Sequence, residues 1–226
     1  RDAVERYTTM RDALLATGRP IVYSICEWGQ NKPWTWAKGV GNLWRTTGDI
    51  SDNWTSLVKL TRLNMVLADY AGPGQWNDPD MLEVGNGGMS DVEYRTHFGL
   101  WAIMAAPLLI GSDLRTVTPA TMEILLNTEI IAVDQDPLGV QGRPVRSHEG
   151  LHVFVKPLED GSRAVALFNE NDSPAEISTT AGDIGLDSSG GYEVRDLWTH
   201  TSVESKGAIA ADVPAHGTAM YRVTAG

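Results

Sequence analysis

The chain has 226 residues, of which 42% are hydrophobic and 21% charged, a balance typical of a globular protein that buries a core. Its formal net charge is −11 and no basic run exceeds two residues, which argues against binding to nucleic acid or to an anionic membrane, because both require clustered Lys and Arg. The most apolar stretch, Leu100–Gly111, is too short to span a bilayer and is interrupted by Pro107.

The sequence begins Arg1-Asp2-Ala3-Val4, with neither an initiator Met nor a signal-peptide pattern, so we expect the chain to be part of a larger protein. Cys26 is the single cysteine. It is either a free thiol or half of a disulfide whose partner lies elsewhere, and the sequence alone favours the free thiol.

Helix-like and strand-like segments alternate through about residue 139. Residues 2–18 have apolar side chains at helical spacing and end at Gly18, which predicts a helix. A strand (19–29), a loop that could contain a helical turn (31–42) and a second strand (43–49) follow. The next helix covers 51–72, with Ser51 or Asp52 as its N-cap.

A third strand that ends in a loop is expected at 74–85 and a helix at 90–106, where Ser90 and Glu93 have the spacing of a capping box. A fourth strand (107–113), a helix with Pro119 near its first turn (118–127) and an exit segment (128–139) complete this region. The alternation predicts a parallel sheet with helices outside it, either an open sheet or half of a (β/α)₈ barrel.

Polar side chains lie where the predicted strands run into the next helices, and they favour the barrel. The residues concerned are Glu27, Arg45, Asp49, Asp78, Asp80, Ser112 and Asp113. Barrels keep their active sites at the carboxyl ends of their strands. Open doubly wound sheets do so too, but usually with a glycine-rich phosphate loop, and the sequence has no such loop.

The remainder of the chain has short strand-like runs separated by turn residues. Residues 151–155 and 164–168 alternate apolar side chains, and Glu159-Asp160-Gly161 between them is a hairpin turn signal. This pattern predicts an antiparallel sandwich of Greek-key type. We therefore divide the chain into a partial barrel at 1–140 and a β domain at 141–226.

The polar residues taken alone leave several functions open. Arg45, Thr47 and Asp49 share a strand face, which suits a sugar hydroxyl but is more simply a salt bridge, with Asp52 as a helix cap. Asp78 and Asp80 flank Pro79 in what could be a metal site or a capped turn. The five histidines are scattered, so a transition metal is not expected, and calcium stays open without an EF-hand spacing.

Tryptophans add a second signal, because seven of the eight lie between Trp28 and Trp101. Aromatic faces beside carboxylates suit a sugar pocket, whereas Trp44 and Trp101 are better explained as core residues. A Ser-His-Asp hydrolase is a weak alternative, since no G-x-S-x-G motif occurs and His97 sits inside a helix.

Five ordered motifs resemble the C-terminal half of glycoside hydrolase family 27 (clan D), the family of α-galactosidases and α-N-acetylgalactosaminidases. They are YSICEWG, LWRTTGDISDNW, AGPGQWNDPDMLEVGN, LWAIMAAPLLIGSDLR and IIAVDQDPLGVQG. The resemblance implies strands five to eight of a (β/α)₈ barrel followed by an antiparallel β domain.

It also implies a retaining enzyme without cofactor or metal that releases terminal α-linked galactose. Asp49 would be the general acid/base and Arg45 its neighbour in the substrate pocket. The residues implied to line the pocket are Glu27, Trp28, Asp80 and Met81. Cys26 resembles a family cysteine that often forms a disulfide, whose partner would be absent here.

The family nucleophile lies in a Lys-Tyr-Asp or Lys-Phe-Asp motif, and this sequence has none. A retaining glycosidase needs two carboxyls, so we expect these 226 residues alone to be inactive. The alternatives are an α-N-acetylgalactosaminidase or β-L-arabinopyranosidase of the same family, a non-catalytic galactose-binding module, and an unrelated carboxylate–metal barrel enzyme. The resemblance implies secretion and an α-galactoside substrate, and a homo-oligomer is left open.

Overall fold

The structure is a computed structural model that describes residues 2–187 and 190–226. Its α-helices are α1 (Ala3–Ala16), α2 (Trp54–Asn64), α3 (Asp91–Ile103), α4 (Pro119–Leu125) and α5 (Thr128–Asp134), with 3₁₀ helices η1 (Pro33–Thr35) and η2 (Met65–Tyr70). The strands of the first region are β1 (Ser24–Ile25), β2 (Leu43–Arg45) and β3 (Trp76–Asp78). Those of the second are β4 (Arg143–His148), β5 (Leu151–Pro157), β6 (Arg163–Asn169), β7 (Ala175–Thr180), β8 (Tyr192–Asp196), β9 (Thr201–Ser205), β10 (Ala208–Val213) and β11 (Thr218–Ala225).

The helix boundaries follow from capping chemistry, with one correction to the sequence analysis. The predicted capping box of α3 is present, with Ser90 and Glu93 each accepting from the other's backbone amide. The cap of α2, however, is Asn53, whose side chain accepts from the amide of Ser56, so the prediction of Ser51 or Asp52 was wrong. The Asp52 carboxylate instead accepts hydrogen bonds from the Gly88 amide and the Tyr94 hydroxyl, which holds a distant loop against the start of the helix.

The first region contains a parallel sheet in the order β1-β2-β3. A parallel bridge between Leu82 and Ile110 is all that forms of the strand predicted at 107–113. Pro107 has no amide to donate to a ladder, which is one reason that this segment pairs only at its centre. The other predicted strands are also shorter than expected: their carboxyl ends leave the sheet as loops, and residues 19–23 at the start of the first predicted strand lie outside β1 as well.

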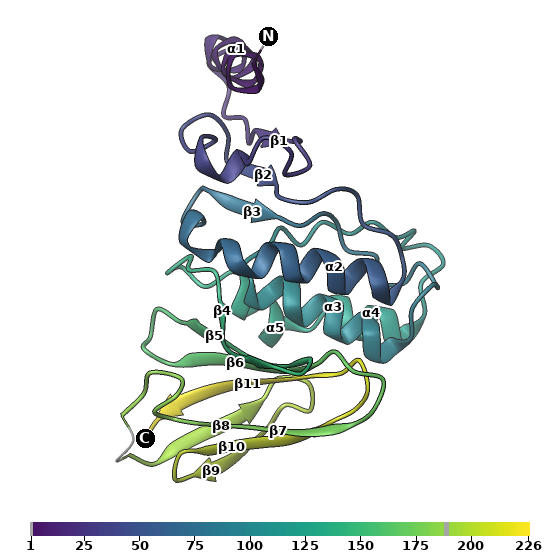
Figure 1. The fold of residues 1–226 in the computed structure, drawn as a ribbon, viewed down its shortest axis with the longest axis vertical. Helices are drawn as coiled ribbons and strands as arrows, with labels where there is room; N and C mark the ends of the chain where they lie inside the picture. Colours follow the sequence, from purple (N-terminus) through teal and green to yellow (C-terminus); the bar gives the residue numbers. More distant parts are fainter. Residues whose placement is uncertain (1, 188–189) are drawn as a thin grey trace.

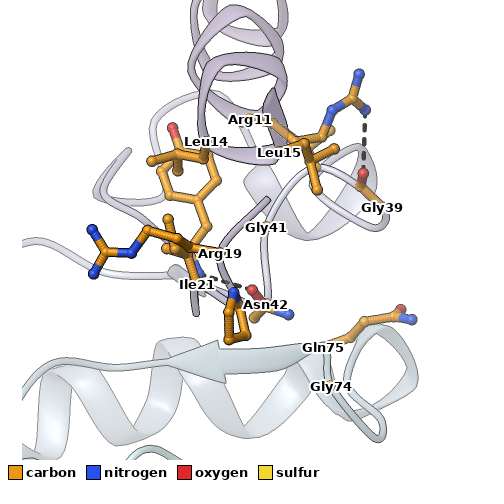
Figure 2. Close-up of a pocket in the computed structure, with 13 residues that line it drawn as sticks. Arg11, Leu14, Leu15, Arg19, Ile21, Gly39, Gly41, Asn42, Gly74 and Gln75 are labelled. Carbon is orange, nitrogen blue, oxygen red and sulfur yellow. Dashed lines mark hydrogen bonds between the residues drawn. The ribbon is translucent and has the colours of Figure 1, made fainter. Parts of the chain in front are cut away.

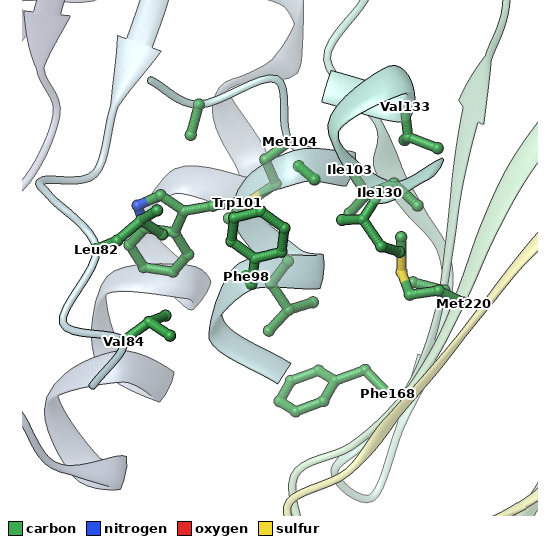
Figure 3. Close-up of a cluster of buried hydrophobic side chains, with 14 of the residues drawn as sticks. Leu82, Val84, Phe98, Trp101, Ile103, Met104, Ile130, Val133, Phe168 and Met220 are labelled. Carbon is green, nitrogen blue, oxygen red and sulfur yellow. The ribbon is translucent and has the colours of Figure 1, made fainter. Parts of the chain in front are cut away.

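Helices α2 to α5 lie between the parallel sheet and the β sandwich, whereas α1 lies at the far end of the molecule (Figure 1). The largest apolar cluster joins the two regions across α3 (Figure 3). Phe98 and Trp101 of α3 contact one side of it, and Phe168 and Met220 of the six-stranded sheet contact the other. Burial of these side chains is what fixes the sandwich against the helices.

The second region is an antiparallel sandwich of a six-stranded sheet, in the order β4-β5-β6-β11-β8-β9, and a two-stranded sheet of β10 and β7. The six-stranded sheet is a middle layer with both faces covered. Val153 and Val165 face the two-stranded sheet, whereas Phe154 and Phe168 face the helices. Strands β5 and β6 are therefore buried along almost their whole length, including the polar residues His152, Lys156 and Asn169. The predicted turn between them is present, with Gly161 at φ +86°.

In the part of the chain that the structure describes, no helix combines the length and apolar character required to cross a membrane.

Candidate active site

The carboxyl ends of three neighbouring strands meet at one edge of the parallel sheet. Ile25 of β1 pairs with Trp44 of β2, and Arg45 of β2 pairs with Asp78 of β3. The segments that follow these strands therefore leave the sheet side by side. Arg45 is the last residue of β2, and the segments that follow the strands carry the other residues assigned to the site by resemblance, namely Glu27, Trp28, Asp49, Asp80 and Met81.

Arg45 forms the centre of this edge. Its Nη2 lies 2.8 Å from Oδ2 of Asp80 and 3.1 Å from Oδ1 of Asp49, so one nitrogen contacts two carboxylates. The Arg45 and Asp80 side chains are 11% and 10% exposed, whereas that of Asp49 is 66% exposed. The buried pair is screened little by water, and the exposed carboxylate projects from it toward solvent.

Asp80 is held in place by its backbone as well as by Arg45. Its φ is +92°, a backbone conformation that residues other than glycine rarely adopt. The Asp80 amide donates to Oδ1 of Asp78, and the Asp80 carbonyl accepts from Nε1 of Trp101, at 2.9 and 2.7 Å. Burial raises the pKa of Asp78.

Glu27 and Trp28 follow β1. The Glu27 side chain is 8% exposed, and it accepts from Arg6 of α1 at 3.2 Å and from the amide group of Asn31. Trp28 has φ +53° and is 48% exposed, so its ring is available to a ligand. Tyr7 of α1 donates to the carbonyl of Cys26, and burial together with the nearby Glu27 carboxylate raises the pKa of Tyr7 to about 12.

The remaining predicted residues differ in accessibility. Met81 is 44% exposed beside Asp80. Cys26 is an exposed free cysteine among the residues that the structure describes. Thr47, predicted to share a face with Arg45 and Asp49, is buried and donates its hydroxyl to the carbonyl of Pro79, so it braces two loops and does not face the site.

The sequence did not predict the ion pair between Arg45 and Asp80. The only available signal was the presence of polar residues after both strands, since the pairing depends on the register of β2 and β3. The sequence also did not predict Arg6 and Asn31 as partners of Glu27, because they come from a separate helix and loop. The predicted proximity of Arg45 and Asp49 was correct, but β2 ends at Arg45 and the contact is made by a loop.

Two cavities of the described chain lie away from these carboxylates. One, of about 430 Å³, lies between α1 and the loops that precede β2 and β3 (Figure 2). There Arg11 donates to the carbonyl of Gly39, and the Tyr23 amide donates to the side chain of Asn42. The other, of about 520 Å³, touches the beginning of all three strands at Ser24, Leu43 and Trp76. Both lie toward the amino ends of the strands, opposite the edge where a barrel active site is built.

No group of three or more His, Cys, Asp or Glu side chains suited to hold a metal ion occurs within residues 2–187 and 190–226. The site is thus a pair of carboxylates around an arginine, next to an exposed tryptophan and an exposed methionine.

Two family profiles match most of the chain, and named relatives and solved structures are similar to it. Residues 1–136 match the profile of the family described as alpha galactosidase A, and residues 148–223 match that of the alpha galactosidase C-terminal beta sandwich domain. Alpha-galactosidase 3 of Arabidopsis thaliana is 54% identical over 98% of this chain and 52% of its own length. Alpha-N-acetylgalactosaminidase of Gallus gallus is 41% identical over 88% of this chain and 52% of its own length.

The crystal structure of alpha-galactosidase I from Mortierella vinacea superposes with a TM-score of 0.95 at 36% identity, covering 98% of this chain and 63% of that one. The chain spans about half the length of the curated relatives it matches. The predicted fold, the C-terminal half of a (β/α)₈ barrel followed by an antiparallel β sandwich, is confirmed by the two family matches and by this neighbour. The chain belongs to the α-galactosidase family, glycoside hydrolase family 27.

Proposed function

We propose that this chain carries the acid/base half of a retaining glycoside hydrolase that releases terminal α-linked D-galactose. The observation that carries the proposal is the exposed Asp49 carboxylate at the carboxyl edge of the sheet, held 3.1 Å from the guanidinium of Arg45. Membership of the α-galactosidase family supports the choice of galactose.

Asp49 is the general acid and base of the proposed reaction. In the first step its protonated carboxyl gives a proton to the leaving glycosidic oxygen. In the second step the carboxylate takes a proton from the water that releases the sugar. The exposure of Asp49 supports this role, because the group must reach both a leaving group and a water molecule.

A retaining mechanism also needs a nucleophilic carboxylate about 5–5.5 Å from the acid/base. Asp80 is a poor candidate, since it is buried, forms an ion pair with Arg45 and accepts from the amides of Ile50 and Met81. We propose that the nucleophile comes from residues outside these 226, and we expect this chain alone to be inactive.

The substrate pocket is assigned by side-chain character. Trp28 and Met81 offer exposed apolar surface to the C–H face of a sugar ring. Arg45 and Glu27 offer a donor and an acceptor for hydroxyl groups, and Arg6 and Asn31 orient the Glu27 carboxylate. Asp80, assigned to the pocket by resemblance, lies behind Arg45 in this arrangement.

The test compares Asp49→Ala with the wild type in the complete gene product that contains this chain. Hydrolysis of p-nitrophenyl α-galactoside, which has a good leaving group, is measured beside that of methyl α-galactoside, which has a poor one. We expect kcat/KM of the variant to fall far more for methyl α-galactoside than for p-nitrophenyl α-galactoside, because only the poor leaving group requires a proton in the first step. Equal losses on both substrates would remove Asp49 from the acid/base role.

The same assay separates the alternatives. Faster turnover of an α-N-acetylgalactosaminide or a β-L-arabinopyranoside than of the galactoside would reassign the substrate within the family. Galactose binding without turnover by the complete protein would indicate a non-catalytic module. The proposal extends to export from the cell and to a domain division near residue 140, which cell fractionation and limited proteolysis test in turn.

A further inference from the structure

Both oxygens of the Asp80 carboxylate already accept a hydrogen bond from a backbone amide. Its Oδ1 accepts from the Met81 amide at 2.9 Å, and its Oδ2 accepts from the Ile50 amide at 2.8 Å. Nη2 of Arg45 forms an ion pair with the same Oδ2, also at 2.8 Å. A carboxylate has about four lone-pair positions, so these amides occupy two of them before any sugar arrives, and Oδ2 also lies against the Arg45 guanidinium.

The surroundings of Asp80 fix it on three sides. Its backbone is held at φ +92°, with the Trp101 indole on its carbonyl and the Asp78 carboxylate on its amide. Trp101 is fully buried in α3 and Asp78 is 5% exposed. A side chain anchored in this way is rigid, and rigidity is what a supporting group contributes to a catalytic site.

Asp80 holds both ends of the segment that carries Asp49. At the start of that segment it binds the Arg45 guanidinium, and at the end it accepts from the amide of Ile50, the residue after Asp49. The same Arg45 nitrogen then reaches Asp49 at 3.1 Å. The position of Asp49, the most exposed group of this network, is thus determined by contacts that Asp80 makes.

The charges of Arg45 and Asp80 also support a positioning role for Asp80. The Arg45 side chain is 11% exposed, and a buried guanidinium needs a compensating anion. Asp80 supplies that anion in the interior, so Arg45 can stay in place whether Asp49 is charged or neutral. An acid/base must alternate between those two states during turnover.

We propose that Asp80 is a positioning residue, which sets the acid/base Asp49 through Arg45 and the Ile50 amide and does not bind the galactosyl unit. This inference rests on the proposed function of Asp49. It predicts that loss of Asp80 affects protonation of the leaving group more than affinity for the sugar.

The test uses Asp80→Asn in the complete gene product, with the two galactosides above and with galactose as a binding probe. Asparagine tolerates a positive φ and keeps one acceptor oxygen, but it removes the charge that holds Arg45. We expect kcat/KM for methyl α-galactoside to fall by about 10²-fold, the scale of a misplaced catalytic group. The loss on p-nitrophenyl α-galactoside should be much smaller, with the Kd for galactose within about threefold of wild type, below the tenfold change expected when a charged hydrogen bond to the sugar is lost.

A double-mutant cycle tests whether the effect passes through Arg45. The variant Arg45→Met/Asp80→Asn should lose no more activity than the worse of its two single variants, because the two residues act as one unit. Asp69→Asn is the matched control, since Asp69 forms an exposed ion pair with Arg143 remote from the site and should leave activity unchanged.

A second variant covers the case in which Asp80→Asn fails to fold. Asp80→Gly relieves the positive φ, and added formate can restore a carboxylate beside Arg45. Recovery of methyl α-galactoside hydrolysis with formate supports the inference, and absence of recovery in a folded protein opposes it. Equal losses on both galactosides, a tenfold weaker affinity for galactose, or additive effects of Arg45→Met and Asp80→Asn would overturn it.

These outcomes are distinct from failure of the proposed function. If the wild type does not cleave galactosides, or if Asp49→Ala loses equal activity on both galactosides, the acid/base assignment is wrong regardless of the role of Asp80. If Asp49→Ala behaves as expected and Asp80→Asn weakens galactose binding, the positioning role alone is wrong.

Discussion

His97 gives the sharpest prediction about stability and pH. It lies on α3 with 0% exposure, its Nε2 accepts from the amide of Glu83 at 3.0 Å, and its ring packs edge-on against Trp101 at 4.2 Å. Burial lowers the pKa of His97 from 6.5 to about 3, because a charged imidazolium would lose its hydration.

The sign of the effect follows from linkage. The unfolded chain takes up a proton at His97 below pH 6.5, whereas the native protein remains neutral there until about pH 3. The free energy of unfolding therefore falls by about 1.4 kcal/mol per pH unit as the pH drops through this window. Between pH 7.5 and pH 5.0 the contribution amounts to about 2 kcal/mol.

The assay is urea unfolding, monitored by tryptophan fluorescence, at pH 7.5 and pH 5.0. In His97→Gln the side-chain oxygen can accept from Glu83 but cannot gain a charge. We expect the wild type to lose about 2 kcal/mol more than this variant between the two pH values. His148→Gln is the control, because the His148 side chain is 77% exposed. The free energy of unfolding of this variant should change with pH as that of the wild type does. Parallel pH dependences of wild type and His97→Gln would refute the reasoning.

Three further substitutions test the fold. Asp78→Asn keeps an acceptor for the Asp80 amide. Because burial raises the Asp78 pKa, this carboxyl lowers the free energy of unfolding of the wild type as pH rises above 3.8, and the variant lacks this loss. The free energy of unfolding of the variant should therefore rise relative to that of the wild type toward neutral pH, and a difference that does not change with pH would contradict this. Ser90→Ala removes the α3 capping box and should lower the free energy of unfolding by about 1 kcal/mol, measured in urea. Phe168→Ala empties a buried site between the sandwich and the helices and should cost about 3–5 kcal/mol in the same assay, whereas Val203→Ala at an exposed position should cost less than about 0.5 kcal/mol.

The sequence predicted correctly several features that depend only on a few consecutive residues. The stop of α1 near Gly18, the capping box of Ser90 and Glu93, and the turn at Gly161 each depend on a few consecutive residues, and all three are present. The cap of α2 was misassigned because three consecutive polar residues could each cap a helix. Asn53 reaches the Ser56 amide, while Asp52 is drawn to Gly88 and Tyr94, which are far away in the sequence.

The strand lengths could not be read from the sequence. An apolar run does not say how many of its residues find a partner, and the segment at 107–113 pairs only through Ile110. The alternation in β5 and β6 also understated burial. Val153 and Phe154 face opposite sides of a sheet that is covered on both, and only the packing of α3 against that sheet reveals the second covered face.

By itself, the sequence determined most of the order of elements, the two-region plan and, through five motifs, the family, although it predicted a strand at 107–113 and did not predict the helix α5. It also put Arg45 close to Asp49, since the two are four residues apart. The tertiary structure alone decided that Asp80 pairs with Arg45 and is buried, whereas Asp49 is exposed. The physical reason is that ion pairing and burial depend on strand register and on contacts from distant helices. These determine the distance between side chains that lie tens of residues apart in the sequence.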